Sequence, residues 1–342
     1  MSSRARSGGI ALVVIALTAA VSSAQQAVPA GPNPAAAAPR TSPTGRPDEV
    51  LATVNGAPIT RAAVLAHLSH FTFPPGKEKE VYDEGLDYLI NVELLKQFLR
   101  QQKVPVTDQE IDAEVARLTR GSGDLDAALK ASNTTMPELR ARHGLILQWK
   151  KYFTAQGTPA ALRRFVEENK DEFNGTRVRA SHILVKVDPS APPAEKEKAR
   201  QRLLAIKREI DSGRMTFAAA ADKYSEDDGN VATKSGGDLG YFPRSGQFIE
   251  EFAAVAFALK PGVVSEPVLT DFGYHLILVT DRKEGTPINF DQYRDRILEQ
   301  FGFDLQSKIL AEQRKTAKID KEPMPTDFFP PIAAQPTPAE PR

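Results

Sequence analysis

Two apolar runs restrict the fold of this chain more than any other feature of its sequence. Val178–Val185 and Tyr274–Val279 are rich in β-branched and aliphatic residues, a composition typical of central strands that are buried on both faces. Between them the pattern predicts two helices, at about residues 194–212 and 217–224, and then a glycine-rich loop at 235–237. A short strand at 238–242 and a third helix at 248–259 follow. This order predicts a compact α+β domain that begins at about Arg177 and ends at about Arg282.

The region before this domain, residues 48–174, predicts a mainly helical domain. Its longest apolar stripe recurs at helical spacing and comprises Leu86, Leu89, Ile90, Leu94, Leu95, Phe98 and Leu99. Thr107–Glu110 and Thr135–Glu138 have the spacing of capping boxes, and a further helix is expected to begin at Thr158-Pro159. Ahead of the helices, Val50–Val54 and the asparagine-glycine pair that follows predict a short strand and a tight turn.

One more long amphipathic helix is expected after the α+β domain, from Asp291 to Ile319 within the segment 288–322. Its apolar side carries Tyr293, Ile297, Phe301, Leu305, Ile309 and Leu310. Because no neighbouring segment offers a partner for this side, we expect the helix to pack on the N-terminal helices. The α+β domain is then inserted between two parts of a helical one.

The first 24 residues have the layout of a secretory signal peptide. Arg4 and Arg6 precede an apolar run from Ile10 to Val21, and the small residues Ser22-Ser23-Ala24 follow it. A retained membrane anchor is the alternative, but the run of 12 residues is shorter than the roughly 20 that span a bilayer as a helix. Cleavage leaves no stable membrane span and places the chain in the periplasm or elsewhere outside the cytoplasm.

Composition narrows the classes of function. Residues 25–47 and 323–342 are rich in proline and small residues, and with so little to bury they are expected to be a disordered linker and a disordered tail. The chain has 44 basic and 44 acidic residues, a balance that does not suit a nucleic-acid partner. It has no cysteine, which excludes thiolate nucleophiles, disulfides and thiolate metal sites.

Five histidines are the candidates for acid–base or metal chemistry. His67 and His70 are three residues apart, but no third ligand follows at a useful spacing, so a structural or surface role is favoured for them and for His143. His182 and His275 each lie within one of the apolar runs, where a buried imidazole needs a hydrogen-bond partner. On residue types alone, a structural pair and a functional pair both stay open.

An ordered series of motifs identifies the α+β domain. The motifs are Ala180–Val185, Tyr224–Asp227, Gly236–Phe242, Gly246–Phe248, Ser265–Val268 and Phe272–His275. Together they closely resemble the parvulin family of peptidyl-prolyl cis–trans isomerases, over residues 177–285. The resemblance implies a four-stranded antiparallel sheet with helices, and we expect neither a metal nor a cofactor. The helical flanks more weakly resemble the chaperone module of SurA-like and PrsA-like exported foldases.

The resemblance also implies roles for seven side chains. Four are implied to be catalytic: His182, Asp227, Thr270 and His275. Three are implied to line the pocket that holds the proline ring: Leu239, Phe248 and Phe252. The alternatives are that Asp227 is a loop carboxylate that caps a turn and that the apolar three are plain core, the role assigned to Phe257.

The implied activity is non-covalent rotation of X-Pro bonds in unfolded or proline-containing exported polypeptides. Rotation breaks no bond, so a dry apolar pocket that favours the twisted amide is enough to accelerate it. The alternative is a chaperone (holdase) for unfolded exported proteins whose parvulin domain is catalytically silent. A metal hydrolase built on His182 and His275 is disfavoured because no carboxylate ligand motif accompanies them.

Overall fold

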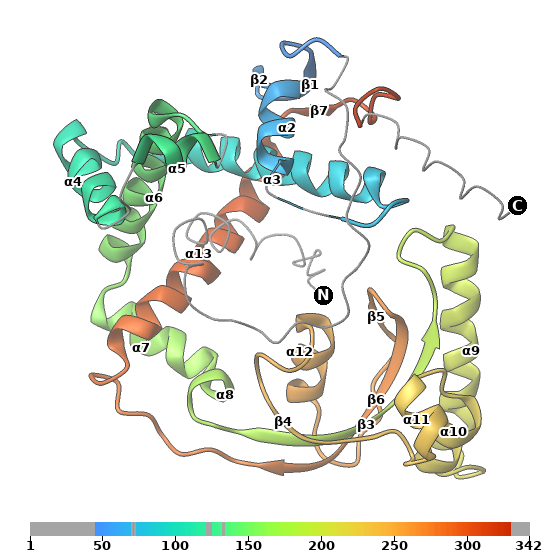
Figure 1. Ribbon diagram of the computed structural model, residues 1–342. Coiled ribbons are helices and arrows are strands. Elements are labelled where there is room, and N and C mark those ends of the chain that lie inside the picture. Colours follow the sequence, from blue (N-terminus) through green and yellow to red (C-terminus); the bar gives the residue numbers. More distant parts are fainter. Residues whose placement is uncertain (1–44, 70, 72, 121–124, 132–133, 330–342) are drawn as a thin grey trace, which may run out of the picture. The chain divides into compact units, whose positions relative to one another are not determined.

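The computed structural model describes residues 45–69, 71, 73–120, 125–131 and 134–329 (Figure 1). The predicted signal peptide, most of the predicted linker and residues 330–342 of the predicted tail lie outside these ranges. The chain divides into two compact units, of which the first ends at Thr158 and resumes at Leu298, and the second is Pro159–Ile297. In the described ranges no helix is long and apolar enough to cross a membrane.

The first unit contains a small three-stranded sheet. β1 (Val50–Val54) and β2 (Ala57–Thr60) form an antiparallel hairpin, and β7 (Ile319–Lys321) pairs antiparallel with the other edge of β1. Asn55 and Gly56 form the turn with φ values of 52° and 84°, the left-handed conformation that a tight hairpin turn requires. The predicted strand and turn are confirmed, and the third strand comes from the far end of the chain.

Helices make up the rest of the first unit. They are α2 (Arg61–Leu68), α3 (Glu78–Gln101), α4 (Asp108–Thr119), α5 (Leu125–Ala131), α6 (Met136–Gln156) and most of α13 (Arg294–Thr316). Thr107 and Thr135 cap α4 and α6, and each forms the reciprocal capping box with Glu110 or Glu138 that the spacing predicts.

One apolar core joins the helices of the first unit to its sheet. The stripe on α3 is buried there with Leu51 and Val54 of β1 and with Leu310 of α13. Arg314 of α13 donates to Asp87 and Asn91 on α3, at 2.9 and 2.7 Å. Helix α13 therefore packs on elements from the other end of the sequence.

The prediction of a disordered tail is wrong for its first residues, 323–329. Phe328 is fully buried, and its ring meets Tyr82 edge-on at 4.8 Å between centroids. Asp327 pairs at 2.7 Å with Arg61, whose side chain is only 2% exposed. Each buried aromatic ring removes roughly 150–250 Å² from water, enough to order a short proline-rich segment that composition alone marks as disordered.

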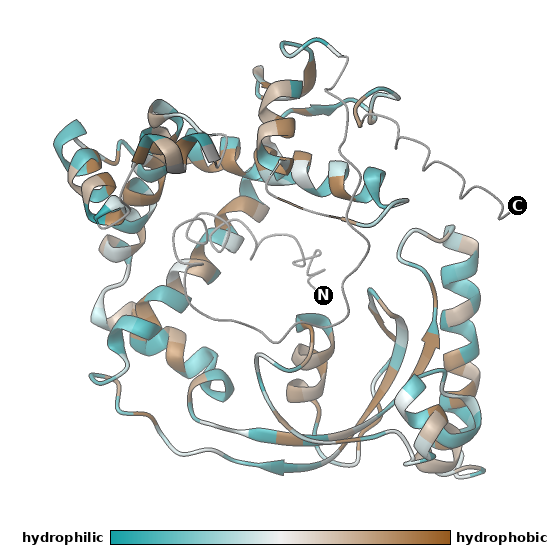
Figure 2. Cartoon of the chain, in the orientation of Figure 1, coloured by the Kyte–Doolittle hydropathy of each residue, from teal (hydrophilic) through white to brown (hydrophobic). Residues whose placement is uncertain are grey.

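A four-stranded antiparallel sheet forms the centre of the second unit, with strand order β4-β3-β6-β5 (Figure 1). Its strands are β3 (Arg177–Lys186), β4 (Asp238–Pro243), β5 (Val268–Thr270) and β6 (Gly273–Lys283). The two apolar runs form the central pair, β3 and β6, which are strongly hydrophobic over much of their length (Figure 2). The predicted α+β class with a four-stranded antiparallel sheet is confirmed.

Helices cover both faces of this sheet. The second unit contains α7 (Pro159–Glu168), α8 (Lys170–Phe173), α9 (Pro193–Asp211), α10 (Phe217–Tyr224), α11 (Asp228–Thr233) and α12 (Glu250–Ala258). Helices α9 and α10 pack on the face that carries Ile183 and Leu276, whereas α12 packs on the face that carries Ala180 and Ile277. Two separate apolar cores result, one on each side of the sheet.

The boundary between the units lies at Thr158, whereas the sequence pattern predicts that the helical domain ends at residue 174. Helices α7 and α8 belong to the second unit because hydrogen bonds tie them to the end of β6 and the segment after it. Asp171 accepts from Arg282 through both carboxylate oxygens, at 2.7 and 2.8 Å. The backbone N–H of Thr286 donates to the carbonyl of Asn174 at 2.9 Å.

Candidate active site

Two histidines, 93 residues apart in the sequence, face each other across the central strands. His182 lies opposite Ile277 and His275 lies opposite Leu184, so the imidazoles are diagonal neighbours on the face covered by α12. Their Nδ1 atoms are 3.2 Å apart, and their exposed fractions are 6% and 5%. The structure therefore brings both predicted histidines together in a nearly dry environment.

Thr270 extends this contact into a hydrogen-bond chain from the edge strand β5. Its Oγ1 lies 2.8 Å from Nε2 of His275 and accepts a hydrogen bond from the N–H of Phe272 at 3.1 Å. The other acceptor within reach of the hydroxyl, the carbonyl of Gly273, is farther away at 3.3 Å. The Asp227 carboxylate at the far end favours the order of protons in which the hydroxyl donates to His275 Nε2, which leaves His275 Nδ1 as a donor.

Asp227 lies at the other end of the chain. Its Oδ2 is 3.6 Å from Nε2 of His182, a buried nitrogen without a hydrogen-bond partner in the described part of the chain. Because His275 Nδ1 donates to His182 Nδ1, the proton of His182 resides on Nε2 and faces the carboxylate. The reverse order of protons directs a lone pair at that carboxylate, so the favourable direction runs from Thr270 to Asp227.

Hydrogen bonds to β3 and to α11 hold Asp227 beside His182. The N–H of the preceding residue, Glu226, donates to the carbonyl of Leu184 at 2.8 Å. Oδ1 of Asp227 accepts from the N–H of Asn230 at 2.9 Å as the N-cap of α11. The carboxylate therefore does cap a turn of helix, as the structural alternative held, and its second oxygen faces the histidine.

Aromatic rings cover the histidine pair. Phe252 of α12 meets His182 and His275 edge-on, at 5.9 and 5.5 Å between centroids, and is itself only 2% exposed. Phe248 stacks on Phe252 at 5.1 Å and is half-buried. Leu239 packs, half-buried, against the same apolar cluster.

Two further phenylalanines support this cluster from below. Phe257 is buried in it, which confirms the core role expected for that residue. Phe242 of β4 is fully buried and meets Phe248 at 4.5 Å, although no role was predicted for it. Its place at an apolar position of a predicted strand was the signal that could have identified it.

Burial keeps both imidazoles neutral at pH 7. Desolvation, reinforced by the neighbouring His182, lowers the pKa of His275 from 6.5 to about 4. Desolvation also lowers the pKa of His182, against the opposing effect of the Asp227 carboxylate. Neutral rings have one donor and one acceptor nitrogen each, which is what the hydrogen-bond chain requires.

The two other described histidines belong to the first unit. His67 stacks on Tyr88 with 4.1 Å between ring centroids, His143 is buried on α6, and His70 is not among the described residues. Within the described ranges, no group of three or more histidine or carboxylate residues is placed to hold a metal ion.

Comparison of the sequence with known proteins identifies its family. Residues 182–281, which include all seven candidate side chains, match the family described as Rotamase, the PPIC-type PPIase domain. The foldase protein PrsA of Geobacillus kaustophilus is 31% identical over 230 residues, which cover 67% of this chain and 72% of that protein. The putative peptidyl-prolyl cis–trans isomerase SurA of Haemophilus influenzae is 28% identical over 258 residues, which cover 70% of this chain and 78% of that protein.

Among solved structures, the peptidylprolyl isomerase PrsA from Bacillus anthracis is 26% identical and covers 67% of this chain and 95% of its own, with a TM-score of 0.41. The sequence relatives extend well beyond the rotamase segment, and the resemblance to parvulins and to PrsA-like foldases is confirmed. This chain therefore belongs to the PrsA foldase family and is a peptidyl-prolyl cis–trans isomerase of the parvulin type.

Proposed function

We propose that this isomerase rotates X-Pro bonds in unfolded exported polypeptides and acts as an extracytoplasmic folding factor. The observation that carries the proposal is the hydrogen-bond chain Thr270–His275–His182, with the Asp227 carboxylate 3.6 Å from its far end, beneath a cluster of aromatic rings. Export is supported by the signal-peptide pattern in the first 24 residues and by relatives named foldase and chaperone.

The proposed mechanism is non-covalent. Cis and trans X-Pro bonds differ by only about 0.5–1 kcal/mol, whereas the rotation barrier is roughly 18–20 kcal/mol, so a catalyst needs only to stabilise the twisted amide. The twisted amide has lost its resonance and carries less charge on oxygen, and an apolar environment favours it. Leu239, Phe248 and Phe252 are proposed to hold the proline ring in that environment.

The polar residues are proposed to act by position and charge. His182, His275 and Thr270 form a rigid neutral base below the rings, since the pKa of each histidine is lowered by burial. The Asp227 side chain is one third exposed, at 33%, and lies at the edge of this base, where its charge acts on the rotating carbonyl. Rotation requires no acyl intermediate, so no covalent role is assigned to it.

The pocket assignment is tested by Phe248→Ala, because Phe248 is half-buried and its loss leaves the buried Phe252 in place. Loss of the apolar contact is expected to lower kcat/KM for a proline tetrapeptide roughly tenfold. Ile249→Ala, at the exposed apolar residue next in the sequence, is the matched control and is expected to retain activity. Equal activity of the two variants would remove Phe248 from the pocket.

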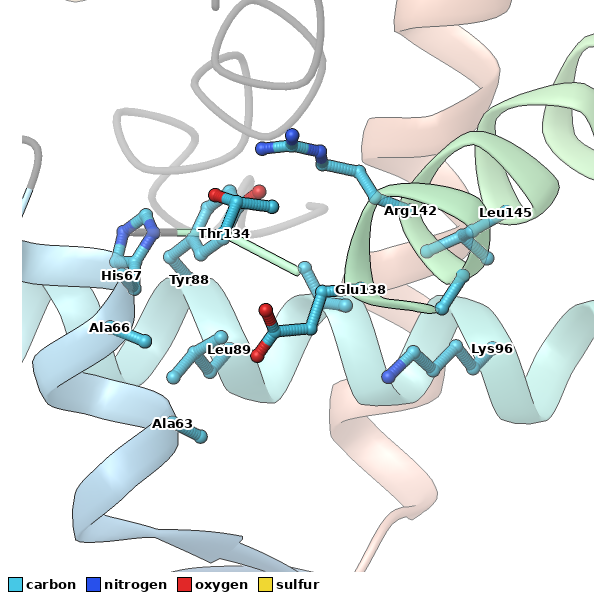
Figure 3. A pocket seen from close by; sticks show the side chains of 12 residues that line it. Ala63, Ala66, His67, Tyr88, Leu89, Lys96, Thr134, Glu138, Arg142 and Leu145 are labelled. Carbon is cyan, nitrogen blue, oxygen red and sulfur yellow. The ribbon is translucent and has the colours of Figure 1, made fainter. Parts of the chain in front are cut away.

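Holding of unfolded polypeptides is a second candidate activity, and a pocket in the first unit favours it (Figure 3). The pocket has a volume of about 300 Å³ between α2, α3 and α6, and its apolar lining comprises Ala63, Ala66, Leu89, Val92, Ala141 and Leu145. Arg142 extends over it, with an Nε that is buried and has no hydrogen-bond partner in the described residues. The lining also carries Lys96 and the carboxylate of Glu138, so it is the apolar part of the pocket that suits an apolar side chain of a client.

A pair of neighbouring alanines on α2 tests the holding activity. Ala63 lines the pocket and Ala62 does not, although both are exposed in the first turn, where an aspartate is compatible with the helix. Ala63→Asp is expected to weaken suppression of aggregation of a denatured client protein, and Ala62→Asp to preserve it. Tetrapeptide isomerisation is expected to be unchanged in both. Identical suppression by the two variants would argue against this pocket.

A further inference from the structure

Helix α12 carries Phe252, and the loop before it carries Phe248, so the position of this helix sets the aromatic side of the site. Ile249, at its N-cap position, makes no side-chain capping bond. A helix of nine residues leaves unpaired N–H and C=O groups at its ends, and these need partners from elsewhere. The second unit places an arginine at each end: Arg282 donates to a carbonyl of the last turn, whereas Arg244, which has no acceptor for an N–H group, holds the first turn through the Glu250 side chain.

Arg244 holds the N-terminal end of α12. Its guanidinium donates to both carboxylate oxygens of Glu250 in the first helical turn, at 2.8 and 2.5 Å. The Arg244 side chain is only 14% exposed, so the pair is partly shielded from water. Because residues 244 and 250 enclose the loop that carries Phe248, this pair fixes both ends of the loop.

Arg282 of β6 holds the C-terminal end. Its Nη1 donates to the carbonyl of Phe257 in the last helical turn at 3.1 Å, and its side chain is 16% exposed. A cation at the C-terminal end of a helix also interacts favourably with the helix dipole.

Both arginines contact the short helix α8. Asp171 accepts from Arg282 through both carboxylate oxygens, at 2.7 and 2.8 Å. The next residue, Glu172, has a carboxylate oxygen 3.9 Å from Nη2 of Arg244. Two adjacent carboxylates thus contribute to the pairing of the two cations that hold α12, which Arg282 also shares with Glu284 at 2.7 Å and Arg244 with Glu250. Both carboxylates lie before the segment 182–281 that matches the rotamase family.

We propose that Asp171 and Glu172 are positioning residues of the isomerase, which hold the two ends of α12 through Arg282 and Arg244 and so keep Phe248 and Phe252 over the histidine pair. A partly buried guanidinium that loses one of its two carboxylates shifts toward the remaining one, Glu284 for Arg282 and Glu250 for Arg244, and the position of the helix end that it holds changes. The segment just before β3 is then a working part of the isomerase. This inference deepens the proposed function and rests on it for its kinetic test.

The test uses the full chain with Asp171→Asn and Glu172→Gln combined. The proline site loosens, so KM for a proline tetrapeptide is expected to rise roughly three- to tenfold while kcat changes less than about twofold. The matched control is Glu167→Gln with Glu168→Gln, which removes the same two charges from exposed positions on α7 and is expected to change neither constant. Asp171→Glu, which keeps the charge, is expected to leave KM close to the wild-type value.

A second measurement does not depend on catalysis. The rings of Phe248 and Phe252 can be followed by NMR in a chain with labelled phenylalanine. Their signals are expected to shift in the variant that combines Asp171→Asn and Glu172→Gln, and not in the control that combines Glu167→Gln and Glu168→Gln. Unchanged rings together with an unchanged KM overturn the inference. If the wild-type chain fails to isomerise the peptide, the proposed function fails, and the ring signals alone decide whether α8 positions α12.

Discussion

At the scale of single residues, Asp227 has two contacts that substitution can separate. Its Oδ1 caps α11, and its Oδ2 faces Nε2 of His182 at 3.6 Å. Asparagine caps a helix about as well as aspartate but has no charge, so Asp227→Asn is expected to change the free energy of unfolding by less than about 0.5 kcal/mol. We expect kcat/KM for a proline tetrapeptide to fall roughly tenfold, equivalent to about 1.4 kcal/mol in the barrier.

The next residue provides the control for this prediction. Asp228 is the same residue type, but its side chain is 91% exposed and contacts Lys186 on the surface. Asp228→Asn is therefore expected to leave both stability and kcat/KM unchanged. A loss of activity of equal size in the two variants would contradict a specific role for the Asp227 charge.

The buried histidines also predict how stability depends on pH. The pKa of His275 is about 4 in the folded chain and 6.5 when unperturbed, so the unfolded chain binds more protons between these values. The stabilisation is fully present above pH 6.5 and is lost as the pH falls towards 4, by roughly 3 kcal/mol for this residue. The lowered pKa of His182 acts in the same direction.

The measurement is urea unfolding of the second unit, followed by NMR signals of β3 and β6 at about pH 7, 5.5 and 4.5. His275→Gln removes one titrating group, so the variant is expected to lose less stability on acidification than the wild type does. Parallel losses in the two proteins would show that His275 is not the buried neutral group described here.

Resemblance to motifs named side chains that the structure brings together, but the sequence could not predict their order of contact. Whether Thr270 donates to His275 depends on the 2.8 Å contact between them and on the Asp227 carboxylate 3.6 Å from His182, which only the folded chain brings together. Arg282 was missed for a similar reason. Arg282 holds α12 through contacts with Asp171 and with the carbonyl of Phe257, and neither residue is near it in the sequence.

At the scale of elements, a close approach between the glycine-rich loop and β3 places His182. Gly237 has a φ of 75°, and a Cβ there would lie 2.2 Å from the carbonyl oxygen of His182. Gly213 has a similar φ of 71° but open space around it. Gly213→Ala is expected to cost about 1–2 kcal/mol for its φ alone, and Gly237→Ala about 1–3 kcal/mol more because β3 must move.

Thermal unfolding and tetrapeptide isomerisation of these two variants check this prediction. Gly237→Ala is expected to lower kcat/KM as well, since the histidine moves with its strand, while Gly213→Ala is expected to retain wild-type kinetics. If both variants lose the same stability and keep full activity, the loop does not position His182.

Elements with local signals could be predicted from the sequence, and elements that depend on distant partners could not. The capping boxes of α4 and α6 and the apolar strands β3 and β6 are encoded within a few residues of one another. Ile319 was expected to end a helix but lies in β7, because it pairs with Val54 at the other end of the chain. Helix α11 has six residues and no apolar periodicity, so the only sequence signal for it is the N-cap residue Asp227.

At the scale of the whole molecule, the first unit depends on both ends of the described chain. Phe328 is fully buried in the same core as the only tryptophan, Trp149. Phe328→Ala is expected to destabilise this unit by about 3–5 kcal/mol. Because Trp149 lies in the first unit, its fluorescence during urea unfolding reports on that unit alone.

The second unit has separate cores and is expected to be unaffected by Phe328→Ala. Isomerase kinetics of the variant should therefore equal those of the wild type at temperatures where both are folded. Phe71→Ala, at an exposed phenylalanine of the same unit, is the control and is expected to leave the fluorescence midpoint in place. A loss of isomerase activity that accompanies the fluorescence shift would contradict two independently folded units.

The central claim is that a proline bond turns without covalent attack where aromatic rings cover a neutral histidine pair. Magnetisation-exchange NMR of a labelled proline tetrapeptide tests it most directly, since it measures the cis–trans exchange rate and the isomer ratio together. With the wild-type chain, exchange is expected to accelerate in proportion to protein concentration at an unchanged isomer ratio, and to return nearly to the uncatalysed rate when Phe248→Ala and Asp227→Asn are combined. Acceleration that survives intact in the double variant, or none at all from a correctly folded wild type, would contradict the account.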